Sequence, residues 1–385
     1  MLRAYLPPFI IAAIIAGGLT YYIKSLAEKF KLVDQPSPRK IHPKPTPRLG
    51  GLAIALAFLI VLIGYTLASH RLEFSGFKTF FLDKRLIGVV SGLIILIVVG
   101  ILDDIRGVKA WKKLFWHIAA ACCVIAFGVT ISYIRLPFGL HLNLANISLP
   151  FTLFSTTYHL VLWGDLVAVF WIVLLINTLN FLDGLDGLAS GVSVITSGVI
   201  FFLALSLGQD ANALLAVLIG GVALGFLPWN FNPARIFMGD TGSMTLGYLL
   251  GVLSIISGGK LATAFLVLGI PLLDVGWVVL RRIFSRRSPF LADTKHLHHR
   301  LLTVGLSQRQ AVIILYLVAT AFGVVAVLAG TEEKIQAVIA LLVLMLFLAI
   351  TLVILEYRKK RLNPPKADRP VAEGDQGREQ DEGIL

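Results

Sequence analysis

Long apolar stretches are the feature of this sequence that most limits how the chain can fold. A helix needs roughly 20 mostly apolar residues to cross a bilayer. Eleven windows meet this requirement, some of them near its lower limit: residues 5–25, 49–69, 85–102, 114–134, 162–179, 187–207, 211–228, 242–257, 261–280, 310–329 and 335–356. We therefore predict an all-α polytopic membrane protein with about 11 transmembrane helices. The window at 242–257 is short and rich in glycine, so we expect it to pack inside the bundle.

Composition excludes the other broad classes of protein. The chain has 385 residues, of which 57% are hydrophobic and only 15% charged. Soluble domains carry about 25% charged residues, and disordered chains have low hydrophobicity. The two cysteines, Cys122 and Cys123, are adjacent within an apolar window. They cannot form a disulfide framework, and we expect them to fill space in a helix.

Basic residues predict how the chain is oriented in the membrane. Of the 34 Lys and Arg residues, 26 lie in or beside the loops that follow odd-numbered windows and in the C-terminal tail. The positive-inside rule places these segments in the cytoplasm, with the N-terminus outside and the C-terminus inside. The net charge of +12 is thereby explained by topology, and no nucleic-acid partner is predicted.

Two segments outside the windows have patterns of their own. Residues 140–149 alternate apolar and polar side chains, which predicts a short extracytoplasmic β-hairpin near 136–149. The tail after residue 358 contains three prolines and mixed charge, which is typical of disorder. We therefore expect a transmembrane domain over 1–358 and a disordered cytoplasmic tail over 359–385.

Polar residues gather at one end of the predicted bundle. Charged side chains at membrane depth are costly and usually functional. Acids, amides and histidines lie at or near the predicted cytoplasmic ends of odd-numbered windows: Asp103, Asp104, Asn180, Asp183, Asp186, Asn230, Asp240, Asp274, His296, His298 and His299. Since chance would divide them between both faces, we expect them to form one convergent site.

The first acidic group is the pair Asp103 and Asp104. Neighbours on a helix point about 100° apart, so one carboxylate can face a reaction while the other orients it or pairs with a cation. Like charges this close raise one pKa, which suits a general base. The structural alternative is a helix-end pair that is neutralised by Arg106 or Lys109.

The second acidic group has Asp183 and Asp186 three residues apart, each followed by a glycine. Glycine permits tight turns and close backbone approach, while the carboxylates suit hydroxyl groups or a cation. The structural alternative for Asp186 is capping of the helix that follows.

The last two groups suggest phosphate chemistry. Residues 237–243, Phe-Met-Gly-Asp-Thr-Gly-Ser, run from a loop into a helix, whose N–H groups favour phosphate, and Asp240 is a candidate ligand for Mg²⁺. The histidines at 296–299 adjoin several basic residues. They allow a zinc site, but without cysteine partners we favour phosphate or sugar binding. Together these parts fit phosphoryl transfer at a membrane surface.

Five motifs, in this order, resemble those of the polyprenyl-phosphate N-acetylhexosamine-1-phosphate transferases, over roughly residues 1–310. They are Val33-Asp34-x-Pro36-x-x-Arg39-Lys40-x-His42-x-x-Pro45-x-Pro47-Arg48-x-Gly50-Gly51, Gly100-x-x-Asp103-Asp104, Asn180-x-x-Asp183-Gly-x-Asp186-Gly187, Asn230-x-x-x-Ala234-x-x-Phe237-Met238-Gly239-Asp240-Thr241-Gly242-Ser243, and Ser288-Pro289-Phe290-x-x-Asp293-x-x-His296-x-His298-His299-Arg300. The stretches Thr46-Pro47-Arg48-Leu49-Gly50-Gly51 and His296 to Arg300 look like the N-acetylglucosamine-1-phosphate branch, not the related phospho-N-acetylmuramoyl-pentapeptide branch.

This resemblance implies a fold, a reaction and a location. The expected fold has eleven spans in the bacterial cytoplasmic membrane. The expected reaction occurs on the cytoplasmic face and needs Mg²⁺, with Mn²⁺ as an alternative. A UDP-N-acetylhexosamine, taken as UDP-N-acetylglucosamine, would donate its sugar-1-phosphate to undecaprenyl phosphate and release UMP. That would be the first membrane step toward an envelope polysaccharide such as lipopolysaccharide or teichoic acid. The resemblance leaves the exact sugar, the prenyl length and a homodimer open.

The resemblance also implies residue roles. Asp103 looks like the base or positioning group for the lipid phosphate, with Asp104 as its partner at the metal and Asp240 as the Mg²⁺ ligand. Nucleotide and sugar contacts are expected from Asn180, Asp183, Asp186, Asn230, Phe237, Arg281, Arg282, His296, His298 and His299. Phosphate contacts are expected from Arg39, Lys40, His42 and Lys113.

Two other classes compete with an enzyme. A secondary transporter or lipid-linked-sugar flippase would suit many spans with intramembrane acids, but it predicts acids near the midplane and paired broken helices. A scaffold or channel subunit would not need several converging polar motifs. Release of UMP by the purified protein separates the enzyme from both.

Overall fold

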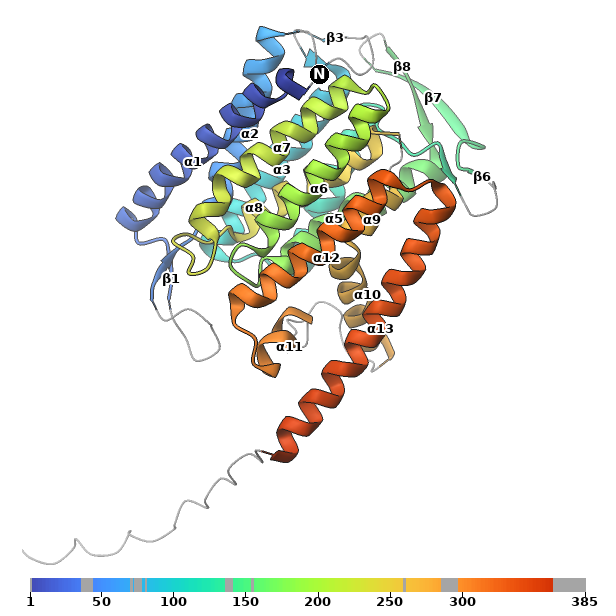
Figure 1. The fold of residues 1–385 in the computed structure, drawn as a ribbon. Helices are drawn as coiled ribbons and strands as arrows, with labels where there is room; N and C mark the ends of the chain where they lie inside the picture. Colours follow the sequence, from blue (N-terminus) through green and yellow to red (C-terminus); the bar gives the residue numbers. More distant parts are fainter. Residues whose placement is uncertain are drawn as a thin grey trace, which may run out of the picture.

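Every predicted apolar window contains a helix or a bent pair of helices. The computed structural model describes residues 2–35, 44–69, 72, 78–79, 82–135, 141–153, 156–258, 261–284 and 297–362. The helices in these windows are α1 (Leu6–Lys29), α2 (Gly50–Ala68), α3 (Lys84–Arg106), α4 (Ala110–Ala126), α5 (Leu162–Leu182), α6 (Leu188–Ser206), α7 (Asp210–Asn230), α8 (Gly239–Ile256), α9 (Leu261–Val267) with α10 (Gly269–Phe284), α12 (Gln308–Leu328) and α13 (Thr331–Leu362). A 3₁₀ turn (Leu2–Ala4) precedes α1, and the short helix α11 (Leu297–Val304) precedes α12 (Figure 1).

Fewer of these helices than predicted are long and apolar enough to cross a membrane alone. Among the described residues there are 7 such helices, or up to 8 if the pair α9 and α10, bent by 83°, counts as one span. Helix α4 has 17 residues and is about 26 Å long, short of the roughly 30 Å hydrocarbon core. It ends at Ala126 instead of reaching the predicted residue 134, and Gly128 two residues later has a positive φ of 86°.

The predicted outer hairpin is replaced by two hairpins. Strand β5 (Tyr133–Arg135) pairs antiparallel with β6 (His141–Asn143), and β7 (Ser148–Leu153) pairs antiparallel with β8 (Thr156–Val161). The alternating segment that we predicted as one hairpin is therefore divided between β6 and β7. Further two-stranded pairs join β1 (Val33–Asp34) to β2 (Thr46–Pro47) and β3 (Lys78–Thr79) to β4 (Leu82–Asp83).

The C-terminal boundary also differs from the prediction. Helix α13 continues to Leu362, beyond the domain boundary predicted at residue 358. The rest of the predicted tail, residues 363–385, lies outside the described residues.

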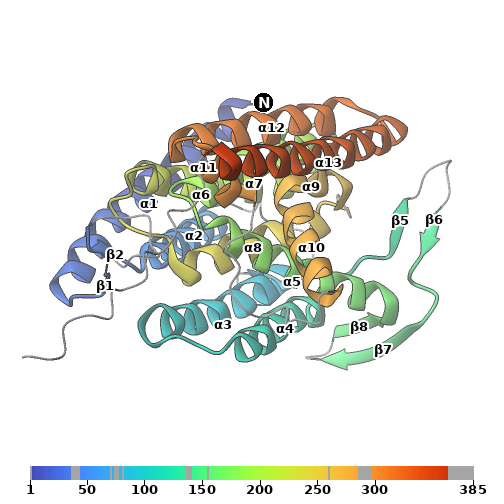
Figure 2. The same ribbon diagram turned by 90° about the horizontal axis from the view of Figure 1, so that it is seen from below.

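Helix α8 is the centre of the bundle. Every residue from Thr241 to Ile255 is buried, and α8 packs against α2, α3, α5 and α7. Figure 2 shows α8 between the layer of α12 and α13 and the layer of α3 and α4. This confirms the prediction that the glycine-rich window at 242–257 packs inside the bundle.

Glycines from three separate sequence motifs allow the backbones to meet at the start of α8. A Cβ atom on Gly51 of α2 would lie 1.9 Å from the backbone nitrogen of Gly242, and one on Gly100 of α3 would lie 2.5 Å from the Cα of Thr241. In addition, the N–H of Gly51 donates to the carbonyl of Met238 at 2.7 Å. The glycines at positions 51 and 100 thus bring α2 and α3 into direct backbone contact with α8.

We expect Gly51→Ala to destabilise the protein because its methyl group would collide with backbone, which cannot rotate away. Overpacking of this kind costs about 1–3 kcal/mol of unfolding free energy. The matched control is Gly64→Ala in the same helix, where a Cβ would meet nothing within 4 Å. Thermal unfolding of the purified proteins in one detergent should show a lower midpoint for Gly51→Ala only. Equal midpoints would refute the close contact.

Candidate active site

The ends of four helices meet at the end of the bundle away from the N-terminus (Figure 1). These are the C-terminal ends of α3 and α5 and the N-terminal ends of α4 and α8, since hydrogen bonds connect residues 103–113, 180 and 240–243. The antiparallel course of consecutive helices returns the chain to this end after every second helix. As a result, acids that are far apart in the sequence converge as predicted.

A lysine bridges two of the predicted catalytic acids. The Nζ atom of Lys113 donates to Oδ2 of Asp103 at 2.7 Å and to Oδ2 of Asp240 at 2.5 Å. The other oxygen of Asp103 accepts from the backbone N–H of Val108. The cation that contacts Asp103 is thus Lys113, in place of the alternatives Arg106 and Lys109.

Asp104 fixes the N-terminus of α8. Its Oδ1 accepts from the N–H of Asp240 at 2.8 Å, and its Oδ2 accepts from the hydroxyl of Thr241 at 2.6 Å and the N–H of Thr241 at 3.2 Å. The first N–H groups of a helix have no partner within it. Since α8 has no side-chain cap of its own, Asp104 supplies the cap from α3 and sets the position of Asp240.

This cap affects the predicted phosphate contact. The N–H groups of Asp240 and Thr241 are both occupied by Asp104. In this structure these two groups are therefore not free for the phosphate that we predicted at this helix start.

Asp183 lies near several other carboxylates. Burial raises the pKa of this carboxyl well above its usual value, and the charges of Asp240, Asp104 and Asp186 raise it further. Removing a charge from water and placing it near like charges both disfavour the ionised form. A cation bound beside these carboxylates would relieve this repulsion.

Three other residues that we predicted to contact the nucleotide lie around this centre, but their side chains form hydrogen bonds with other residues of the protein. Asn180 donates to the hydroxyl of Ser243 at 3.0 Å. Asp186 accepts from the side chain of Asn232 and the N–H of Ala234, so it holds the loop after α7 instead of capping α6. Asn230 is 2% exposed. Its side-chain oxygen accepts from the N–H of Gly187 and the hydroxyl of Ser190, and its side-chain nitrogen donates to the carbonyl of Ile236. In this structure Asp186 and Asn230 therefore position the loops around the site.

The first loop reaches the site through Phe237. The N–H of Phe237 donates to the carbonyl of Pro47 at 2.9 Å, and its carbonyl accepts from Gly50 at 3.0 Å. The Phe237 side chain is half-buried. This pairing brings the motif at 46–51 against the motif at 237–243.

Several predicted residues are placed only partly. Arg282 is buried at 9% exposure on α10. Arg281 lies on α10, and His298 and His299 lie on α11, as backbone positions. Arg39, Lys40, His42 and His296 are outside the described residues.

Three further groups near the site were not identified from the sequence. The hydroxyl of Tyr316 donates to the carbonyl of Gly187 at 2.5 Å, and the side chains of Gln308 and Arg309 bind Asn232. His117, one helical turn after Lys113, is 3% exposed with no hydrogen-bond partner for either ring nitrogen. These residues lie in apolar windows or at their edges, where side chains are usually read as packing. The capping box of Ser307 and Gln310 was a signal that could have marked the start of α12.

The carboxylates of this site suit a hard cation such as Mg²⁺, although they do not form a complete set of metal ligands in advance. Within the described ranges, no three His, Cys, Asp or Glu side chains form a ready metal-binding group. Mg²⁺ needs only one or two carboxylates when substrate phosphates and water supply the other ligands. The excess of carboxylates around Asp183 meets that need.

Comparison with known proteins identifies a matching family and several relatives. The family model for glycosyl transferase family 4 matches residues 86–258. A probable undecaprenyl-phosphate N-acetylglucosaminyl 1-phosphate transferase from Bacillus subtilis is 35% identical over 89% of this chain and 89% of its own. A decaprenyl-phosphate N-acetylglucosaminephosphotransferase from Mycolicibacterium smegmatis is 34% identical over 80% of this chain and 77% of its own. A phospho-N-acetylmuramoyl-pentapeptide-transferase from Staphylococcus aureus is 26% identical over 74% of this chain and 86% of its own.

We expect Asp104→Ala to lower the stability of the substrate-free, metal-free protein, because three donors at the start of α8 lose their acceptor. A buried donor without a partner costs about 1–3 kcal/mol. Asp104→Asn keeps one acceptor oxygen and should fall between the wild type and the alanine variant. The measurement is thermal unfolding with EDTA present. Identical midpoints for all three proteins would contradict the capping role.

We expect Asp183→Asn to remove a pH-dependent loss of stability. With a raised pKa, the folded protein holds a proton that the unfolded chain has lost, so the free energy of unfolding falls as pH rises from about 4. The asparagine variant carries no charge there. Its melting temperature relative to the wild type should rise between about pH 4 and pH 8. Parallel melting curves across this range, measured in EDTA, would contradict the raised pKa.

Proposed function

Because the chain belongs to glycosyl transferase family 4, we propose that it transfers N-acetylglucosamine-1-phosphate from UDP-N-acetylglucosamine to a polyprenyl phosphate and releases UMP. The names of the relatives that match most of the chain support N-acetylglucosamine as the sugar and a polyprenyl phosphate as the acceptor. We take undecaprenyl phosphate as the acceptor, as in the Bacillus subtilis relative. The product would be the first lipid-linked intermediate of an envelope polysaccharide.

The observation that carries this proposal is the contact of Lys113 with both Asp103 and Asp240. Phosphoryl transfer between two anionic substrates needs groups that position phosphates and neutralise charge as it develops. Lys113 provides a cation at the junction of three helices, and its two acids provide a proton acceptor and a metal ligand. A transporter would not need this combination at one end of the bundle.

The chemical step that we propose is direct attack. An oxygen of the polyprenyl phosphate attacks the β-phosphorus of the UDP-sugar, and the bond from that phosphorus to the bridging oxygen breaks. The electrons of the broken bond leave with UMP. Asp103 positions the acceptor phosphate and accepts its proton if one is present, while Lys113 interacts with phosphate oxygens. Since the acceptor already carries an anionic oxygen, no covalent enzyme intermediate is needed.

Asp240 is the residue that would hold Mg²⁺, with Mn²⁺ as an alternative. When bound, such an ion would supply positive charge that neutralises the diphosphate. The three hydrogen bonds of Asp104 to α8 favour a positioning role for this residue over the predicted role of a second metal ligand. Asn180 and Asp183 remain our candidates for nucleotide and sugar contacts, together with Phe237, Arg281, Arg282 and the three histidines. Arg39, Lys40 and His42 remain candidates for phosphate.

The proposed setting is the bacterial cytoplasmic membrane with eleven spans, the N-terminus outside and the site inside. The contacts among helix ends lie at the end of the bundle opposite the N-terminus (Figure 1), which agrees with this orientation. The short helices α4 and α8 would count as spans: neighbouring helices bury α8, while α4 exposes large apolar side chains such as Trp111 and Phe115. A homodimer remains compatible with this setting.

We expect Asp240→Asn to reduce turnover by about 100-fold or more, because the proposed metal ligand loses its charge. The measurement is UMP release from UDP-N-acetylglucosamine with undecaprenyl phosphate and Mg²⁺. The matched control is Asp210→Asn, which should retain activity. Asp210 begins α7 and accepts from Tyr5 near the start of the chain, at the other end of the bundle.

Two outcomes would count against the proposal. Absence of UMP release by the folded wild-type protein would favour a transporter. Isolation of a phosphorylated or glycosylated enzyme in the absence of lipid acceptor would exclude direct attack.

A further inference from the structure

The sharp bend between α9 and α10 places an acid beside the helix that carries the histidines. The two helices meet at 83°, and Pro271 lies just after the bend. Gly269 permits the bend to pack closely, since a Cβ there would lie 2.0 Å from a side-chain carbon of Leu341 on α13. The helix that follows the bend carries Asp274 toward the start of α11.

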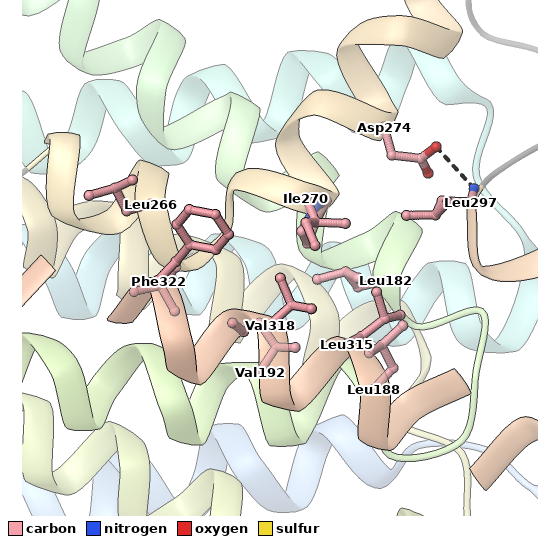
Figure 3. A pocket seen from close by; sticks show the side chains of 13 residues that line it. Leu182, Leu188, Val192, Leu266, Ile270, Asp274, Leu297, Leu315, Val318 and Phe322 are labelled. Carbon is pink, nitrogen blue, oxygen red and sulfur yellow. Dashed lines mark hydrogen bonds between the residues drawn. The ribbon is translucent and has the colours of Figure 1, made fainter. Parts of the chain in front are cut away.

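Asp274 caps α11 from outside that helix. Its Oδ1 accepts from the backbone N–H of Leu297 at 3.0 Å, as Figure 3 shows. Leu297 is the first residue of α11, where backbone N–H groups have no partner within the helix. A negative side chain at this position also interacts favourably with the helix dipole.

The side chain of Leu297 is anchored as well. It is 7% exposed and lines an apolar pocket with Leu182, Leu188, Ile270 and Leu315 (Figure 3). The centre of a water molecule could reach about 30 Å³ of this pocket. The pocket walls therefore hold Leu297 through apolar packing.

This packing contact adjoins the acidic loop. Leu182 and Leu188 directly precede and follow the segment 183–187, which contains Asp183 and Asp186. Leu297 lies between His296 and His298 in the sequence. The residue at the centre of the histidine motif thus packs against the two residues that flank the acidic motif.

We propose that Asp274 and Leu297 are positioning residues, which hold the start of α11 so that the histidine segment keeps a fixed place relative to the acidic loop. Asp274 holds the backbone and the pocket holds the side chain. This inference rests on the proposed function, in which the histidines contact the sugar nucleotide. It assigns a task to Asp274, which the proposed reaction does not use directly.

Hydrogen exchange of the full-length, ligand-free protein tests this anchor without depending on activity. In Asp274→Ala, peptides that contain Leu297 should exchange about tenfold faster, because one hydrogen bond is lost. Asp274→Asn keeps an acceptor oxygen and should stay within about threefold of the wild type. Leu297→Ala should also speed exchange of α11. Leu266→Ala is the control, since Leu266 lines the same pocket at a distance from α11 (Figure 3).

Kinetics supply the second measurement. We expect Asp274→Ala to raise the KM for UDP-N-acetylglucosamine about tenfold with a smaller change in kcat, and Asp274→Asn to restore most of the loss. Unchanged exchange of α11 in Asp274→Ala would overturn the proposal, and so would equal damage from alanine and asparagine. If the wild type released no UMP, the proposed function would fail while the exchange results still decided the anchor.

Discussion

The start of α8 is held by the carboxylate of Asp104 from another helix, and the rest of the site depends on this contact. A buried helix end has N–H groups that must find partners, because leaving them without one is costly. Asp104 provides partners from the end of α3. The requirement to satisfy one helix end therefore brings α3 and α8 together and fixes the position of Asp240. Glycines at positions 51 and 100 allow the backbone approach that this arrangement needs.

Charge balance explains why Lys113 belongs to the same centre. Asp103, Asp104, Asp183 and Asp240 approach one another within an apolar bundle, where repulsion is weakly screened. Lys113 offsets part of this charge through its contacts with Asp103 and Asp240. Burial raises the pKa of Asp183, and the remaining charges of Asp240, Asp104 and Asp186 raise it further. In the reaction that we propose, a divalent cation would neutralise that remaining charge.

Much of the fold could be predicted because hydrophobicity is a strong and local signal. All eleven windows contain helices, and the burial of α8 followed from its short, glycine-rich sequence. The convergence of Asp103, Asp104 and Asp240 followed from the alternation of spans and loops. Where helices stop was harder to predict, since α4 ends before its apolar sequence does and the segment beyond it forms strands.

The role of each polar residue within the site could not be predicted, because it depends on which hydrogen-bond partner that residue has in the folded structure. The motif at 237–243 suggested free N–H groups, but the sequence does not reveal that Asp104 of α3 occupies two of them. Asn230 and Asp186 have the composition of ligand contacts, yet their hydrogen bonds go to neighbouring loops. Tyr316 and Gln308 support the same loops from α12, and the capping box of Ser307 and Gln310 marks the start of that helix without indicating these contacts.

The carboxylate cover over the α8 helix start has a consequence for inhibitor design. In many phosphate-binding proteins an anionic compound gains affinity from exposed helix N–H groups. Here Asp104 already accepts from the N–H groups of Asp240 and Thr241, so a diphosphate mimic would gain no affinity from them. A nucleoside that carries a protonated amine would instead be attracted by the carboxylate of Asp104.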